Sequence, residues 1–362
     1  MISESLKFTF FNKKLEVLNI AVPLIFLLVG GVEIFFQFKF DTFEFNNINF
    51  IGQLFSFNSI HIICTPLYLL YVPEFRNYIE QKKINTNKKF IYLWFVPPLF
   101  FAILFIWLFH LYNSNLISAA LFMLFFNAYR AIYVVLAVNH EAGQNFGISV
   151  INYSNFSSIT GQKISSEIYF LEKSLWFHVI LATTINVIVL CGFFTGFRLP
   201  IALFFLSTVT CHLLLIILKL SKLKFSFVMY KILYFMRYLL FPLSFMSAFC
   251  AVGLAAAHGT EHLLVAEKAF KNIKFERKLH VHLLMVLFLI IYFGALLYIF
   301  NYQLTVSTTG SIPKEAIFFV VSYVVVNSSI LFHTFCEAHI FKFSDSFVKK
   351  NQGKLFQTGT GF

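Results

Sequence analysis

The segment 225–266 decides how this chain folds; it reads FSFVMYKILYFMRYLLFPLSFMSAFCAVGLAAAHGTEHLLVA. It is mostly apolar and longer than the roughly 20 residues that a bilayer-spanning helix needs. Pro242 lies near its middle, and a proline inside a helix kinks or breaks it. The segment is therefore either an interfacial helix followed by one span, or two spans that turn at Pro242.

The composition of the whole chain places this segment in a membrane protein. Hydrophobic residues make up 59% of the 362 residues and charged residues only 12%, whereas about 25% of the residues of a soluble domain are charged. The five cysteines are scattered and form no C-x-x-C pair, so a disulfide framework is not expected. Further apolar runs predict spans near 16–37, 51–73, 90–112, 116–140, 174–197, 200–222, 280–301 and 315–341.

Positive charge distinguishes nine crossings from ten. Lysine and arginine cluster in the loops 74–89, 219–224 and 267–279 and in the tail after residue 341, and cytoplasmic loops are enriched in these residues. With the N-terminus inside, ten crossings place all four clusters on the cytoplasmic side, whereas nine crossings would put the last two outside. We therefore predict an all-α polytopic transmembrane helical bundle with about ten membrane-spanning helices, with nine as the alternative.

The predicted topology also gives the domain organisation and the location. Residues 1–341 are expected to form a single transmembrane helical domain, and residues 342–362 a short, polar, basic cytoplasmic tail. The longest inner loop is predicted at 141–173. We expect the protein in a bacterial inner membrane with both termini in the cytoplasm. The net charge of +12 lies mainly in inner loops, where anionic lipid headgroups account for it, so no nucleic-acid partner is expected.

Three predicted inner helix ends carry polar residues at a spacing of four. Residues four apart lie on the same face of a helix, so each helix end presents two polar side chains in one direction. Ionisable groups inside a membrane are costly and are commonly functional. The pairs are His140 with Gln144, His258 with His262, and His333 with Glu337, and Glu141 and Glu261 lie beside the first two.

These three helix faces predict a metal centre. Helical bundles build carboxylate–histidine metal sites from such pairs on facing helices. Imidazole and carboxylate together suit iron, zinc or manganese better than magnesium or calcium. Glu261 and Glu337 are also the candidate catalytic residues, and Gln144, Tyr153 and Glu141 are expected around the ligands. The predicted metal ligands are His140, His258, Glu261, His262, His333 and Glu337.

Other interpretations of the histidines stay open. A histidine at a helix end is commonly a hydrogen-bonded interfacial residue, and His212 falls in the middle of a predicted span, outside the three motifs. HGTEH, from His258 to His262, satisfies the HxxEH pattern of a zinc peptidase family. His140 and His333 would suffice to ligate a b-type haem. Zinc and haem are therefore the alternatives to iron. The interfacial interpretation is the preferred one for His178, His280, His282 and His339.

The polar helix ends also contain three signatures, HxxxQxxG, HGxE and HxxxExxIFK, which begin at His140, His258 and His333. They resemble those of a group of bacterial multi-span membrane proteins of unassigned activity, and the resemblance covers the chain from about residue 130 onward. More loosely, the pattern is similar to that of histidine-rich membrane oxygenases such as fatty-acid desaturases, alkane hydroxylases and carotene-cleaving dioxygenases. The HxxHH box of the desaturases does not occur in the chain.

We therefore expect an integral-membrane metalloenzyme, a metal-dependent oxidoreductase with iron as its cofactor in a di-iron centre. Its substrate would be a membrane lipid or another apolar small molecule that reaches the site from the inner leaflet, and an electron-donor protein is its expected partner. Hydroxylase, desaturase and oxygenase chemistry all fit such a site. The alternative is a proton- or ion-coupled transporter or channel, and a further alternative is an intramembrane zinc hydrolase.

Overall fold

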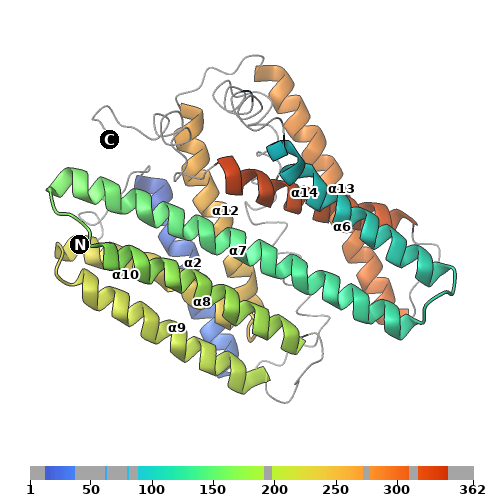
Figure 1. The fold of residues 1–362 in the computed structure, drawn as a ribbon, viewed down its shortest axis with the longest axis horizontal. Helices are drawn as coiled ribbons and strands as arrows, with labels where there is room; N and C mark the ends of the chain where they lie inside the picture. Colours follow the sequence, from blue (N-terminus) through green and yellow to red (C-terminus); the bar gives the residue numbers. More distant parts are fainter. Residues whose placement is uncertain are drawn as a thin grey trace. The chain divides into compact units, whose positions relative to one another are not determined.

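The computed structural model describes residues 13–36, 62, 80, 89–190, 198–271, 278–309 and 317–340. Every regular element among these residues is a helix (Figure 1), so the predicted all-α class is confirmed. The predicted span 51–73, apart from one residue, and the tail 342–362 lie outside the described residues.

The chain divides into two compact units, each assembled from two stretches of sequence. The first unit comprises residues 1–58 and 138–268, and the second comprises residues 59–137 and 269–362. In the first unit α8 (Ser166–Leu190) packs against α9 (Arg198–Leu220), and in the second α14 (Ile317–Ile340) packs against α6 (Lys89–Asn113) and α13 (Lys278–Thr309). The first unit contains α2 (Lys13–Phe35), the later part of α7 (Ala119–Thr160), α8 (Ser166–Leu190), α9 (Arg198–Leu220), α10 (Phe225–Phe235), the 3-10 turn η3 (Met236–Leu239), α11 (Leu240–Leu243) and most of α12 (Ala248–Lys271). The second contains α6 (Lys89–Asn113), the start of α7, α13 (Lys278–Thr309) and α14 (Ile317–Ile340).

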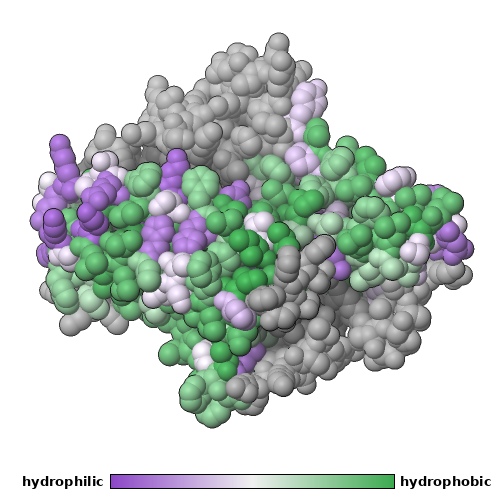
Figure 2. Space-filling model, turned by 60° about the horizontal axis from the view of Figure 1, so that its bottom comes forward, coloured by the Kyte–Doolittle hydropathy of each residue, from purple (hydrophilic) through white to green (hydrophobic). Residues whose placement is uncertain are grey.

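Several helices have the length and composition of membrane spans, which indicates a membrane protein. Hydrophobic residues cover large parts of the face in Figure 2. A shorter apolar helical stretch, Leu283–Ile299, lies within α13. Ten crossings stay a prediction. Among the described residues, the five helical stretches long and apolar enough to cross a membrane are Lys13–Phe35, Phe95–Asn113, Ala119–Thr160, Leu199–Leu220 and Ile317–Cys336.

The segment 225–266 is broken, as Pro242 predicts, but it breaks in two places. The α-helix α10 gives way to the 3-10 turn η3, and the chain turns between α11 and α12 just after Pro242. The carboxylate of Glu33 in α2 lies at the start of α12, where it accepts hydrogen bonds from the backbone N–H groups of Ala248 (3.2 Å) and Phe249 (3.3 Å). Helix N-termini have unsatisfied N–H groups and favour negative charge, so Glu33 fixes where α12 begins.

Helix α7 is longer than the sequence predicted. The predicted loop at 141–173 is wrong, because the helix continues to Thr160, ends at Gly161 in a left-handed conformation (φ 72°), and α8 starts at Ser166. The extension is polar, which is why its hydropathy indicated a loop. Asn145, Ser149 and Asn152 recur at helical spacing and are buried. The polar face of this extension therefore faces the interior of the first unit.

Close packing of α2 against the start of α12 depends on Gly30. A methyl group at this position would clash with the side chains of Cys250 and Ser247, whereas Gly31 has no atom within 4 Å of the corresponding position. We expect Gly30→Ala to lower the melting temperature of the detergent-purified protein, at a cost of about 1–3 kcal/mol from overpacking. Gly31→Ala is the matched control and should leave the melting temperature unchanged or slightly raised, because alanine favours helix. Equal melting temperatures for the two variants would contradict this packing.

Candidate functional site

Two of the predicted ligands meet inside the first unit. His140 on α7 and His258 on α12 have ring centroids 5.2 Å apart, with ring planes at 82°. His258 is buried, and so is His262, which lies one turn further along α12. The i, i+4 spacing that singled out α12 in the sequence therefore leads to a histidine pair between α7 and α12.

The separation of these two rings fits a shared metal ion. Metal–nitrogen bonds of about 2.1 Å put a ring centroid about 3.2 Å from the ion, so two imidazoles at a tetrahedral angle have centroids about 5.2 Å apart. The observed 5.2 Å equals this value. A nitrogen of each ring also lies within 4.8 Å of one on the other ring, so both side chains can approach one ion.

Glu261 points into a set of hydrogen-bond donors. Its carboxylate forms an ion pair with Arg237 of η3 and accepts a hydrogen bond from the Tyr234 hydroxyl at 2.8 Å. With its side-chain nitrogen turned toward the carboxylate, Asn145 of α7 donates to both oxygens, at 2.6 and 2.7 Å. All four residues are buried or nearly so. Three donors from three elements thus surround the Glu261 carboxylate, which lies between His258 and His262 in the sequence.

A second buried ion pair lies between α8 and α10. The Nζ atom of Lys231 is 3.3 Å from a carboxylate oxygen of Glu172, and both side chains are almost completely buried. Lys231 also donates to the Ser149 hydroxyl, and its Nζ lies 4.0 Å from the centroid of the Tyr153 ring. The Tyr153 hydroxyl donates to Glu172. Tyr153, which was predicted to lie around the metal ligands, thus contacts both members of this ion pair.

A third buried acid joins the network from α2. Glu16 accepts a hydrogen bond from the Tyr230 hydroxyl at 2.5 Å, and this hydroxyl in turn accepts one from the Asn152 amide at 2.6 Å. Arg237 donates to the backbone carbonyl of Asn19, also on α2, at 3.0 Å. The first unit therefore buries three acids and two bases together, namely Glu16, Glu172, Glu261, Lys231 and Arg237. Only good pairing can offset the free-energy cost of removing these charges from water.

Most of this network was not predicted from the sequence. Ten crossings require Lys231 and Arg237 to lie within a span, where near helix ends such side chains either reach the membrane surface or face protein. Both are fully buried against carboxylates, so they face protein. The positions of these two charges within the apolar segment 225–266 could have identified them, because charged residues in such segments are commonly functional. Tyr230, Tyr234 and Arg237 also recur at helical spacing on one face of α10 and η3.

The remaining predicted residues lie in both units. Glu141 and Gln144 are on α7 in the first unit, where both are partly buried. His333 is a buried residue of α14 in the second unit, and Glu337 follows it one turn later on the same helix, with its side chain outside the described part of the chain. The structure thus brings together His140 and His258 within one unit, and it supplies Glu261 with partners that the sequence did not predict.

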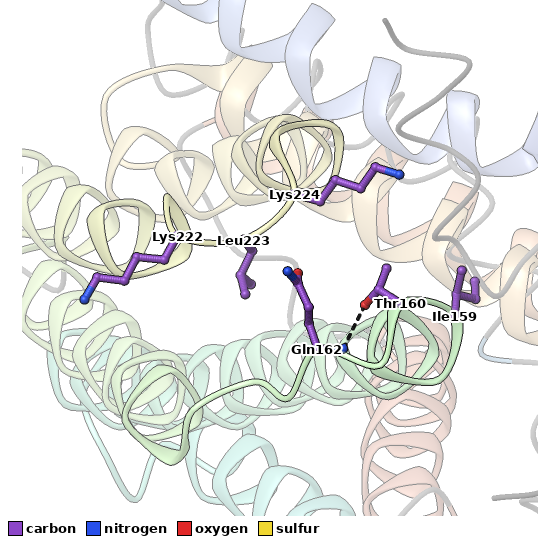
Figure 3. A pocket seen from close by; sticks show the side chains of 6 residues that line it. All are labelled: Ile159, Thr160, Gln162, Lys222, Leu223 and Lys224. Atoms are coloured by element: carbon purple, nitrogen blue, oxygen red, sulfur yellow. Dashed lines mark hydrogen bonds between the residues drawn. The ribbon is translucent and has the colours of Figure 1, made fainter.

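The first unit also has an open hollow, of about 500 Å³, between the end of α7 and the turn from α9 to α10 (Figure 3). The amines of Lys222 and Lys224 extend away from Gln162 in opposite directions. The part of the hollow between these two lysines is therefore lined by uncharged atoms. None of the predicted ligands lines it. The lining residues are Ile159, Thr160, Gln162, Lys222, Leu223 and Lys224.

Comparison of the chain with protein-family models, with curated proteins and with solved structures finds no match.

Proposed function

We propose that this protein is a membrane-embedded metalloenzyme that uses iron to oxidise a lipid or another apolar substrate. The observation that carries the proposal is the 5.2 Å separation of the His140 and His258 rings, which suits two nitrogen ligands of one ion. Imidazole ligands are typical of iron sites in oxygenases. His262, which lies one turn from His258, stays a sequence-based prediction as a further ligand.

In this proposal the protein residues position the metal and exclude water. Bound iron would supply the redox chemistry, and a separate electron-donor protein would supply the electrons. Glu261 acts as a positioning residue, because its bonds to Arg237, Tyr234 and Asn145 tie α12 to η3 and α7. These contacts keep the His258 ring directed at α7. The buried surroundings of His258 and His262 limit the access of water to the metal.

His333 and Glu337 stay sequence-based predictions as further ligands. They lie one turn apart on α14, and the HxxxE spacing is the reason for assigning them. The inner-leaflet position of the site and the cytoplasmic termini likewise rest on the lysine and arginine clusters of the sequence.

The proposal is tested by purifying the protein in mild detergent with native lipids and measuring iron together with oxygen consumption. We expect bound iron and oxygen uptake that depends on an added reductant and on a lipid fraction. Iron-free protein that gains no iron on anaerobic addition of Fe²⁺ would overturn the proposal.

A second candidate function, a proton- or ion-coupled transporter, is favoured by the buried charges of the first unit. Glu16 and Glu172 each have one buried carboxylate oxygen without a hydrogen-bond partner among the described residues. Ionisable side chains buried within membrane spans are common in proton relays and ion pathways.

The two candidates differ in what a liposome experiment should show. If the protein is an enzyme, proteoliposomes should show no proton or Na⁺ flux above that of protein-free liposomes under an imposed gradient. Lys231→Met, which removes the cation beside Glu172, should then change nothing in this assay. Proton or Na⁺ flux in wild-type proteoliposomes that exceeds the flux of protein-free liposomes would establish the transporter and contradict the enzyme.

A further inference from the structure

Two histidines outside the three motifs face each other across α8 and α9. The Nδ1 atoms of His178 and His212 are 3.3 Å apart, and the ring centroids are 5.6 Å apart. Both side chains are partly buried. Neither α8 nor α9 carries a second histidine, so no i, i+4 pair marks either residue in the sequence.

The proton position on His212 is determined by its neighbours. Its Nε2 atom is 3.0 Å from the backbone carbonyl oxygen of Leu171 and 3.0 Å from the Ser174 hydroxyl. The Ser174 hydroxyl itself donates to Leu171 at 2.8 Å, so both neighbours are acceptors for His212. Nε2 therefore carries the hydrogen, and the lone pair of Nδ1 points toward His178. Histidines that bind metals are held in the same way, by donating the other ring N–H to a carbonyl.

Thr208 allows His178 to adopt either neutral tautomer. The Thr208 hydroxyl oxygen is 3.0 Å from Nε2 of His178 and 3.2 Å from the carbonyl oxygen of Phe205. If the hydroxyl donates to His178, then Nδ1 of His178 carries a hydrogen and donates to His212. If the hydroxyl donates to Phe205, then Nε2 of His178 donates to Thr208. Nδ1 of His178 then has a lone pair that faces the lone pair of His212.

The second arrangement leaves two nitrogen lone pairs facing each other, which is favourable only with a cation between them. Metal–nitrogen bonds of about 2.05 Å at a tetrahedral angle separate two ligand nitrogens by about 3.3 Å, and the observed separation is 3.3 Å. A change of the His178 tautomer, in which Nδ1 gives up its hydrogen and Nε2 takes one up while the Thr208 hydroxyl turns toward Phe205, thus converts a hydrogen-bonded pair into a pair of metal ligands without movement of either helix.

We propose that His178 and His212 form a metal-binding site for Zn²⁺ or a similar divalent ion, separate from the site of His140 and His258. Both ligands are neutral imidazoles, which suit zinc and copper. The partial exposure of the pair leaves space for further ligands at the remaining coordination positions. A bound ion would link α8 to α9, so this site has a structural consequence that can be measured without any activity assay.

The test uses Zn²⁺ added to chelator-treated protein, with melting temperature and retained zinc as the two measurements. A His258→Ala background separates this site from the proposed iron site. We expect Zn²⁺ to raise the melting temperature by several degrees and about one equivalent of zinc to be retained, because a ligand that binds only the folded state stabilises it. His280→Gln, which changes an exposed histidine on α13, should behave like its parent.

His212→Gln and His178→Gln should each abolish the temperature rise and the retained zinc. In His212→Gln the amide can still donate to Leu171, so the helix contact is kept while the Nδ1 ligand is lost. The two changes lie on different helices, so one folded variant is sufficient for the comparison. Zinc binding that persists in a folded variant of either position, or no zinc-dependent rise in the parent, would overturn the proposal.

Discussion

Replacement of His258 by alanine is expected to reduce the iron content of the purified protein from about one equivalent or more per chain to background. His258 and His140 supply nitrogens at a separation that fits one ion, and no apolar side chain can replace an imidazole ligand. His140→Ala should therefore have the same effect, although it lies on a different helix. His280→Ala is the control, because that side chain is exposed on α13.

Glu261→Gln distinguishes a positioning role from that of a metal ligand. If Glu261 holds α12 through Arg237, the variant should melt at a lower temperature, because buried Arg237 loses its counter-charge. It should still retain iron when purified at low temperature. Loss of iron in a Glu261→Gln protein of unchanged melting temperature would make Glu261 a ligand, as the sequence alone predicted.

Removal of the buried Lys231 cation is expected to be among the most destabilising single changes in the first unit. Lys231→Met leaves Glu172 buried without its ion-pair partner, and breaking a buried pair in this way costs about 3–5 kcal/mol. The expected result is a large fall in the melting temperature in detergent. The double variant Lys231→Met with Glu172→Leu should recover part of the loss, because no unpaired charge then remains.

The chain provides a control in a second, exposed ion pair that also involves α8. Lys219 and Glu167 form an ion pair of 2.7 Å, but their side chains are 47% and 56% exposed. Lys219→Met should therefore cost about 0–1 kcal/mol. Similar melting temperatures for Lys231→Met and Lys219→Met would contradict the importance assigned to the buried network.

Apolar runs predicted the positions of most described helices, because a bilayer span needs length and hydropathy that are visible along one segment. The same criterion failed after residue 140. The polar residues Asn145, Ser149 and Asn152 suggested a loop, whereas they form the inward face of a longer α7. Hydropathy cannot distinguish a polar face that faces water from one that faces buried charges. The partners of these residues, Tyr230 and Lys231, are about 80 residues away in the sequence.

The candidate site was likewise predicted from the sequence only in part. The i, i+4 spacing of His258 and His262 pointed to α12, and the helix-end pattern pointed to His140 on α7; the structure places His140 and His258 together. The partners of Glu261 come from η3 and α7, so no local pattern shows them. His178 and His212 are single histidines on separate helices, and their pairing follows only from the packing of α8 on α9.

The central claim, that His140 and His258 bind one iron ion, is tested most directly by pulsed electron paramagnetic resonance of the iron-loaded protein. A paramagnetic ion bound by both residues should show magnetic coupling to at least two imidazole nitrogens, and the iron signal itself should be absent from each single alanine variant. Iron signals without histidine nitrogen coupling, or couplings unchanged in both variants, would contradict the claim.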